Sequence, residues 1–124
     1  MKFKEFSFVA YAVDDVKRAR AFYEGVLGLK PSSIYEGDKN AFIEYEIGGD
    51  TLAIGKGAKN FKVGKKGATV ALELEGNFET TIKKLKDKKV VFLMDPYDGP
   101  VCKMALIEDT EGNQIMIHQR KKKS

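Results

Sequence analysis

Few side chains of this 124-residue chain are suited to acid–base or nucleophilic chemistry. His118 is the only histidine, and an imidazole exchanges a proton near neutral pH without help from its surroundings. Cys102 is the only cysteine, and in a Cys–His arrangement Glu73 would be the group that orients the histidine. These residues lie on separate segments, so their spacing does not define a catalytic site. Glu44, Glu73 and His118 are the candidates for catalytic residues. For His118 the alternative is a position on the surface or at the rim of the sheet, without a catalytic role.

The single cysteine also bears on the cellular setting of the protein. A chain with one cysteine forms no internal disulfide, which favours a reducing, cytoplasmic environment. We expect Cys102 to be a buried structural thiol rather than a reactive one. The length corresponds to one domain, residues 1–124, which can bury about two thirds of the surface of its unfolded chain.

The charge balance argues against a nucleic-acid or membrane partner. The net charge is +4, from 22 Lys and Arg against 18 Asp and Glu, but a basic tail at residues 120–124 carries all of this excess. The rest of the chain is balanced, whereas nucleic-acid binding requires a basic face. No run of apolar residues approaches the roughly 18 that a membrane span requires. We therefore expect neither nucleic acid nor membrane as a partner.

The chain repeats one pattern, first over residues 8–29 and again over residues 69–85. Each copy has alternating apolar and polar residues, then a polar capping residue, then apolar residues at helical spacing. The capping residues are Asp15 and Asn77, both of types that favour a helix N-terminus. Each copy therefore predicts a strand followed by an amphipathic helix.

The remaining segments extend this repeat into two βαβββ modules of an α+β fold. Turn residues Gly48-Gly49-Asp50 and Gly112-Asn113 predict hairpins, and Gly28 predicts the end of the first helix. We expect strands at residues 6–13, 32–36, 41–47, 51–56, 69–75, 90–94, 101–107 and 114–119, and helices at 16–27 and 78–87. Module one then covers about residues 3–56, a Gly/Lys-rich linker about 57–67, and module two about 68–119.

Two motifs resemble the vicinal oxygen chelate superfamily, which includes glyoxalases, bleomycin-resistance proteins and extradiol dioxygenases. Residues 15–29, with Asp15, Ala21-Phe22-Tyr23-Glu24 and Leu27-Gly28-Leu29, resemble its first-helix signature, and residues 109–116 resemble its closing Asp-Pro-Asp-Gly-Asn motif. The resemblance covers about residues 6–119. It implies two βαβββ modules whose strands curl into an open, barrel-like sheet with helices outside and a ligand cavity inside. It also implies a homodimer.

The resemblance also indicates which residues would hold a metal ion. Metal-binding members use a His or Glu on the first strand of each module and a Glu on the last strand. Here those positions are Phe8, Thr69 or Val70, and Met116, and face parity favours Thr69. Only the carboxylate at Glu44 matches a family ligand. We therefore expect neither a divalent metal nor another cofactor.

An alternative is a relocated divalent-metal site, and its residues would be Glu44, Glu46, Glu73 and His118.

Strand alternation predicts which side chains would line the ligand cavity. These are mostly apolar with a few polar groups, as is usual for a small-molecule site. The expected ligand-binding residues are Phe8, Ala10, Glu44, Thr69, Ala71, Glu73, Met116 and His118, with Ala12 and Gln114 on the same face.

Three functions follow from this lining. The first is a metal-free protein that binds, sequesters or senses a small amphipathic or aromatic molecule. The second is a lyase, isomerase or dioxygenase-like enzyme with a relocated metal site. The third is an interaction module whose pocket is filled by its own side chains.

Overall fold

The structure is a computed structural model that describes residues 2, 4, 6–58, 61–64 and 69–121. The chain divides into two compact units, module one (residues 1–64) and module two (residues 65–124). Parts of the expected linker, residues 59–60 and 65–67, lie outside the described residues, and so do residues 122–124 of the expected basic tail. In the part of the chain that is described, no helix is long and apolar enough to cross a membrane.

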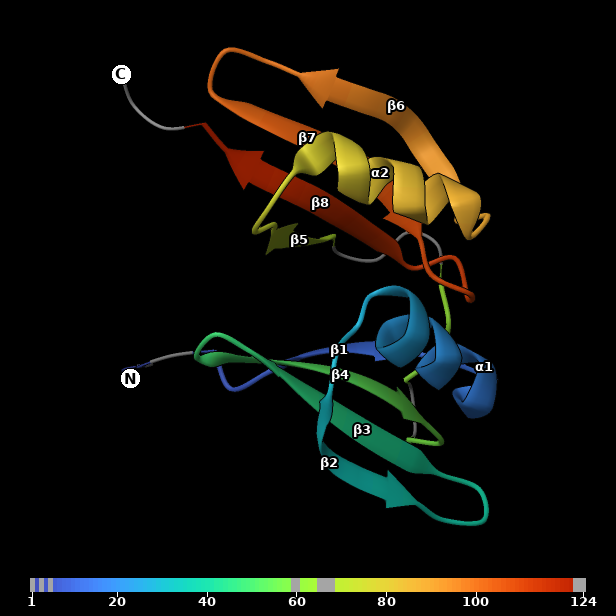
Figure 1. The fold of residues 1–124 in the computed structure, drawn as a ribbon. Helices are drawn as coiled ribbons and strands as arrows, with labels where there is room; N and C mark the ends of the chain where they lie inside the picture. Colours follow the sequence, from blue (N-terminus) through green and yellow to red (C-terminus); the bar gives the residue numbers. More distant parts are fainter. Residues whose placement is uncertain (1, 3, 5, 59–60, 65–68, 122–124) are drawn as a thin grey trace. The chain divides into compact units, whose positions relative to one another are not determined.

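Module one is a four-stranded sheet with a helical segment after its first strand (Figure 1). The strands lie in the order β1-β4-β3-β2, with β1 parallel to β4 and the other neighbours antiparallel. The elements are β1 (Val9–Ala12), α1 (Val16–Arg20), the π-helix η1 (Ala21–Val26), β2 (Pro31–Glu36), β3 (Ala41–Ile47) and β4 (Asp50–Lys56).

Module two repeats this topology (Figure 1). Its strands lie in the order β5-β8-β7-β6, again with one parallel pair, β5 and β8. The elements are β5 (Val70–Glu73), α2 (Phe78–Asp87), β6 (Phe92–Asp98), β7 (Cys102–Glu108) and β8 (Gln114–Arg120). Both sheets are open, so the predicted α+β fold of tandem βαβββ modules is confirmed.

The capping predictions are correct, but the first helix is not one regular helix. The side chains of Asp15 and Asn77 accept hydrogen bonds from backbone N–H groups three residues later, at 3.0 and 2.8 Å. The helix expected over 16–27 is α-helical only to Arg20 and then widens into η1, where the Leu27 N–H donates to the carbonyl of Phe22. Gly28 follows with φ of 74°, a conformation that favours glycine.

Several strand boundaries differ from those expected because pairing partners set them. The first strand begins at Val9 rather than residue 6, because its pairing with β4 begins there. The strand β5 ends at Glu73 rather than residue 75, because its pairing with β8 ends there. The strand expected at 90–94 is β6, which runs on to Asp98 through Pro96. Because β6 is an edge strand with two register shifts, it accommodates a residue without an N–H.

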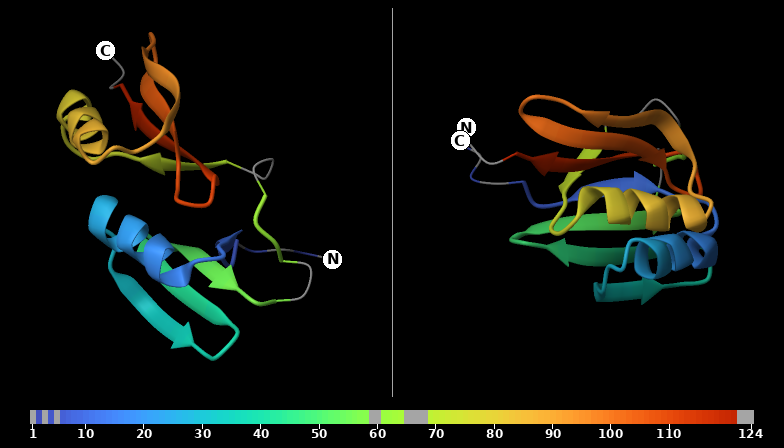
Figure 2. Two further views of the ribbon diagram at one scale, coloured as in Figure 1. Left: turned by 90° about the vertical axis from the view of Figure 1, so that its right-hand side faces the viewer. Right: turned by 45° about the horizontal axis from the view of Figure 1, so that its top comes forward.

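Each sheet has one face that its own helix covers (Figure 2). Alternation is clear on β8, where Ile115 and Ile117 are buried and Gln114, Met116 and His118 are partly exposed. In module one the ring of Tyr23 stacks on that of Tyr45 with centroids 5.9 Å apart. We call the opposite side of each sheet its helix-free face. It carries the side chains predicted to bind a ligand.

Candidate functional site

On the helix-free face of module two, strand register brings four of the predicted residues together. The parallel pairing of β5 with β8 places Ala71 opposite Met116 and Glu73 opposite His118. Thr69 precedes β5, and its hydroxyl donates to Oε1 of Gln114 over 2.9 Å. All six side chains predicted for this module therefore lie on one face, and none is fully buried.

Val70 lies on the other face of β5. Its register partner is Ile115, which is buried on the face that α2 covers. Thr69 therefore shares the helix-free face with the other predicted residues and Val70 does not, in agreement with the strand parity that favoured Thr69.

A polar pair, Glu73 and His118, lies on this face at the end of β5. Nδ1 of His118 lies 2.7 Å from Oε1 of Glu73, and Oε2 of Glu73 accepts a hydrogen bond from the backbone N–H of Arg120 at 2.7 Å. These contacts, the Arg120 N–H first and His118 second, lower the pKa of Glu73 below its usual value. Glu73 is therefore a carboxylate at neutral pH, with both oxygens engaged.

Apolar side chains flank the polar pair on β7 and β6. Met104 lies opposite His118, and Leu106 lies opposite Met116, in the antiparallel pairing of β7 with β8. On β6, Tyr97 is the register partner of Met104 and is exposed. The face therefore combines one hydrogen-bonding pair with a thioether-rich apolar surface.

The helix-free face of module one holds the remaining predicted residues. Ala10, Ala53 and Glu44 form a row across β1, β4 and β3. The ring of Phe8 meets that of Phe42 edge to face, with centroids 5.6 Å apart. Phe8, Ala10 and Glu44 therefore lie on one face of this module, and their binding of a ligand stays a prediction.

The described residues do not fit a divalent metal site. Among them, no group of three or more His, Cys, Asp and Glu is placed to hold a metal ion. The register partner of Glu44 on β4 is Ala53, and both oxygens of Glu73 already accept hydrogen bonds. Of the four residues of the relocated site, Glu73 and His118 contact each other in module two, whereas Glu44 and Glu46 belong to module one.

Cys102 is buried with a free thiol, as expected. It lies opposite Arg120, two residues beyond the pairing of Met104 with His118. The thiol is thus buried while the imidazole is partly exposed, so the structure does not present them together as a nucleophile and base.

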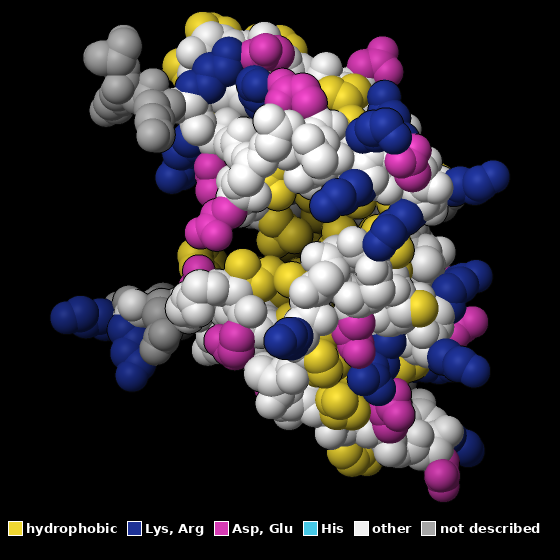
Figure 3. Space-filling view, viewed as in Figure 1, with side chains coloured by type: hydrophobic (Ala, Val, Ile, Leu, Met, Phe, Trp, Pro, Cys, Tyr) yellow, Lys and Arg dark blue, Asp and Glu magenta, His cyan; other side chains and the backbone are white. Residues whose placement is uncertain are grey.

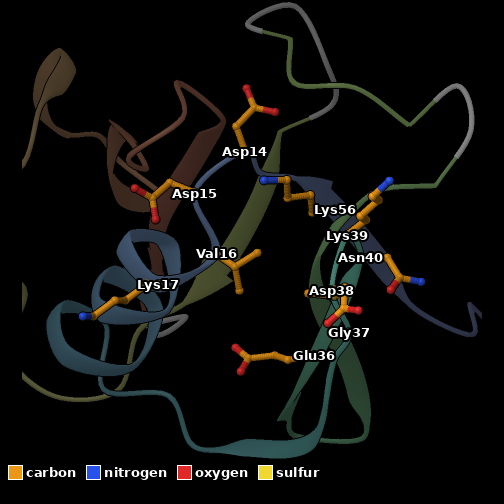
Figure 4. Close-up of a pocket in the computed structure, with 11 residues that line it drawn as sticks. Asp14, Asp15, Val16, Lys17, Glu36, Gly37, Asp38, Lys39, Asn40 and Lys56 are labelled. Carbon is orange, nitrogen blue, oxygen red and sulfur yellow. The ribbon is translucent and has the colours of Figure 1, made fainter.

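Sequence reasoning missed a hollow on module one (Figure 4). It measures about 520 Å³ and lies between the first turn of α1 and the turn that joins β2 to β3. Its charged lining is mixed, with Asp15, Glu36 and Asp38 against Lys39 and Lys56. These residues lie at the ends of helices and strands or in the turn between β2 and β3. Only the fold brings these segments together, so the sequence carried no signal for the hollow.

A smaller hollow of about 260 Å³ lies at the corresponding place in module two, between the start of α2 and β6. Phe78, Ile82 and Pro96 contribute to its lining, so it is more apolar than the hollow of module one. The internal repeat therefore includes these two hollows as well as the helices and strands.

Charged side chains of both signs are interspersed on each module in the face shown in Figure 3. Hydrophobic side chains also reach the surface in that view. Among the exposed large hydrophobic residues of module one are Ile34 and Tyr35 of the edge strand β2. The helix-free faces are therefore not the only places where apolar groups meet solvent.

Two βαβββ modules in one chain define a class of α+β proteins, and comparison with known proteins identifies the family. The family model of the Glyoxalase/Bleomycin resistance protein/Dioxygenase superfamily matches residues 5–117. The chain belongs to this superfamily. No protein of curated function matches the sequence.

Solved structures share the fold at low sequence identity. TnmS3, an antibiotic binding protein from Streptomyces sp. CB03234, has a TM-score of 0.80 at 18% identity, covering 98% of this chain and 99% of that one. An integron cassette protein from the mobile metagenome of V. Cholerae has a TM-score of 0.72 at 22% identity, covering 96% and 97%. The fosfomycin resistance protein FosX from Listeria monocytogenes has a TM-score of 0.75 at 11% identity, covering 95% and 94%.

Proposed function

We propose that this protein binds a small amphipathic or aromatic molecule without a metal ion, on the helix-free face of module two. The observation that carries this proposal is the Glu73–His118 pair within an apolar surface that includes Met104, Leu106 and Met116. Small-molecule sites combine such apolar surface with a few fixed polar groups. Phe8, Ala10 and Glu44 would supply the corresponding surface of module one.

The superfamily and its solved members support a binding role. One structure of the same fold is an antibiotic binding protein and another a fosfomycin resistance protein. Sequestration of a small molecule is therefore compatible with this scaffold. We extend the proposal to a homodimer, on the resemblance, and to a cytoplasmic protein, on the single cysteine.

The proposal excludes a metal because of the residues at the ligand positions of metal-binding relatives. Phe8 offers no donor atom, Thr69 uses its hydroxyl in a hydrogen bond to Gln114, and Met116 offers a soft thioether. A divalent ion that prefers carboxylate and imidazole ligands would find only Glu44 among these positions.

Ligand screening by thermal shift tests the binding role. Catechols, antibiotics and small organic acids are the compounds to screen, and a ligand at 100 times its Kd adds about 2.7 kcal/mol to the free energy of unfolding. We expect aromatic compounds to stabilise the protein, and Met116→Gln to weaken their binding. Ile34→Gln changes an exposed apolar residue of module one and serves as the control. The proposal fails if no compound stabilises the protein, or if Met116→Gln binds each of them unchanged.

Elemental analysis tests the metal-free part separately. Protein purified without chelator should contain far less than one equivalent of any divalent ion. A stoichiometric ion that Glu44→Gln or His118→Gln removes would overturn this part and favour an enzyme with a relocated metal site.

A further inference from the structure

The contact between Glu73 and His118 determines which imidazole nitrogen carries the proton in the neutral ring. Glu73 is ionised, and a carboxylate only accepts hydrogen bonds. Nδ1 of His118, at 2.7 Å from Oε1, must therefore be the donor. In the neutral imidazole the other nitrogen, Nε2, then has a free lone pair and acts as an acceptor.

The carboxylate that fixes this tautomer is itself held in place. Its second oxygen accepts the backbone N–H of Arg120, at the end of β8, while Glu73 is the last residue of β5. The contact thus spans a parallel strand pair whose register aligns Glu73 with His118. A histidine fixed at Nδ1 by a carboxylate is oriented for a partner at Nε2.

Nε2 points away from Glu73, because the two nitrogens lie on different sides of the imidazole ring. In the described part of the chain no hydrogen bond to Nε2 is found. The His118 side chain, on the helix-free face, is 23% exposed. Its register partner on β7 is Met104, and Leu106 lies opposite Met116 at the next position on this face, so the imidazole has apolar neighbours.

We propose that Nε2 of His118 accepts a hydrogen bond from the hydroxyl group of a phenolic ligand. The inference rests on the proposed function and specifies its ligand class. The aromatic ring of the ligand would lie on the thioethers of Met104 and Met116, because sulfur makes favourable contacts with aromatic rings. The hydroxyl supplies the donor that the fixed tautomer requires.

The tautomer can be measured directly because His118 is the only histidine. A long-range ¹H–¹⁵N spectrum recorded at alkaline pH shows which nitrogen of the neutral imidazole carries the proton. We expect the Nδ1–H form, and loss of that preference in Glu73→Ala. The matched control is Glu75→Ala, which removes an exposed carboxylate two residues away. An Nε2–H form in the unaltered protein would overturn the inference.

Ligand selectivity is tested with 4-methylphenol and its methyl ether, 4-methylanisole, which differ in the hydroxyl donor. We expect the phenol to bind about fivefold more tightly, the equivalent of one neutral hydrogen bond of about 1 kcal/mol. His118→Leu and Glu73→Ala should reduce the difference to less than twofold, and Glu75→Ala should preserve it. Equal binding of both probes overturns the inference and leaves the proposed function standing. Binding of neither overturns the inference, and the thermal-shift screen then decides the proposed function.

Discussion

The hydroxyl of Tyr45 donates a hydrogen bond to Oε2 of Glu24 over 2.9 Å and ties η1 to the sheet of module one. The same carboxylate accepts hydrogen bonds from Nε and Nη2 of Arg20 at 2.7 and 3.1 Å. Tyr45 is fully buried, and burial together with Glu24 raises the pKa of its phenol. The phenol therefore stays protonated and remains a donor throughout the physiological pH range.

Removal of the Tyr45 hydroxyl should lower the stability of the protein. A hydrogen bond to a charged group contributes about 1.5–3 kcal/mol, so Tyr45→Phe should reduce the free energy of unfolding by roughly that amount. Tyr35→Phe removes the same atom from an exposed ring on β2 and should change the stability by less than about 0.5 kcal/mol. Urea denaturation measures both. Equal effects of the two substitutions would show that the contact with Glu24 is not stabilising.

Acid should weaken the same contact. Arg20 is the main cause that lowers the pKa of Glu24 below its ordinary 4.5, with a smaller contribution from Tyr45. A carboxyl group with a lowered folded-state pKa stabilises the fold above its unfolded pKa, and this stabilisation is lost as the pH falls through the folded-state value. The free energy of unfolding should therefore fall below about pH 4.5. In Glu24→Gln the fall should be shallower, and an unchanged acid limb would contradict this assignment.

The sequence predicted those parts of the fold that depend on residues close together in the sequence. Asp15, Asn77 and Gly28 mark helix ends because caps use contacts within one turn. The face of Thr69 was predictable because side chains alternate along a strand. The contact of Glu73 with His118 was not, since it depends on the register between β5 and β8. The path of β6 through Pro96 and the widened η1 likewise depend on tertiary packing.

The loop between β7 and β8 offers a third test, centred on Asp109. Its Oδ1 accepts the backbone N–H groups of Glu111 and Asn113, each at 2.8 Å, and its Oδ2 accepts the Asn113 side-chain amide at 2.7 Å. Asp109 and Asn113 are both buried. Asp109→Ala leaves these donors without their acceptor, so we expect a loss of about 2–4 kcal/mol in the free energy of unfolding. Asp38→Ala, at an exposed position, is the control, and thermal denaturation compares them.

A stability loss below about 1 kcal/mol for Asp109→Ala would mean that water replaces the carboxylate in this loop. The position of Asp109 in the closing motif would then need another explanation than loop geometry.

Gly57, directly after β4, gives the last test because two effects act on it at once. Its φ is 96°, and a Cβ there would lie 2.5 Å from the carbonyl oxygen of Lys39 and 2.9 Å from the Cα of Asn40. Gly48 also has a positive φ, of 63°, but a Cβ on Gly48 would meet no atom within 4 Å. Backbone strain alone costs about 1–2 kcal/mol, so Gly48→Ala should destabilise the protein by that amount. Gly57→Ala adds a clash with backbone atoms and should cost clearly more. Equal losses of stability in chemical denaturation would show that the chain relieves the clash by moving the β2–β3 turn.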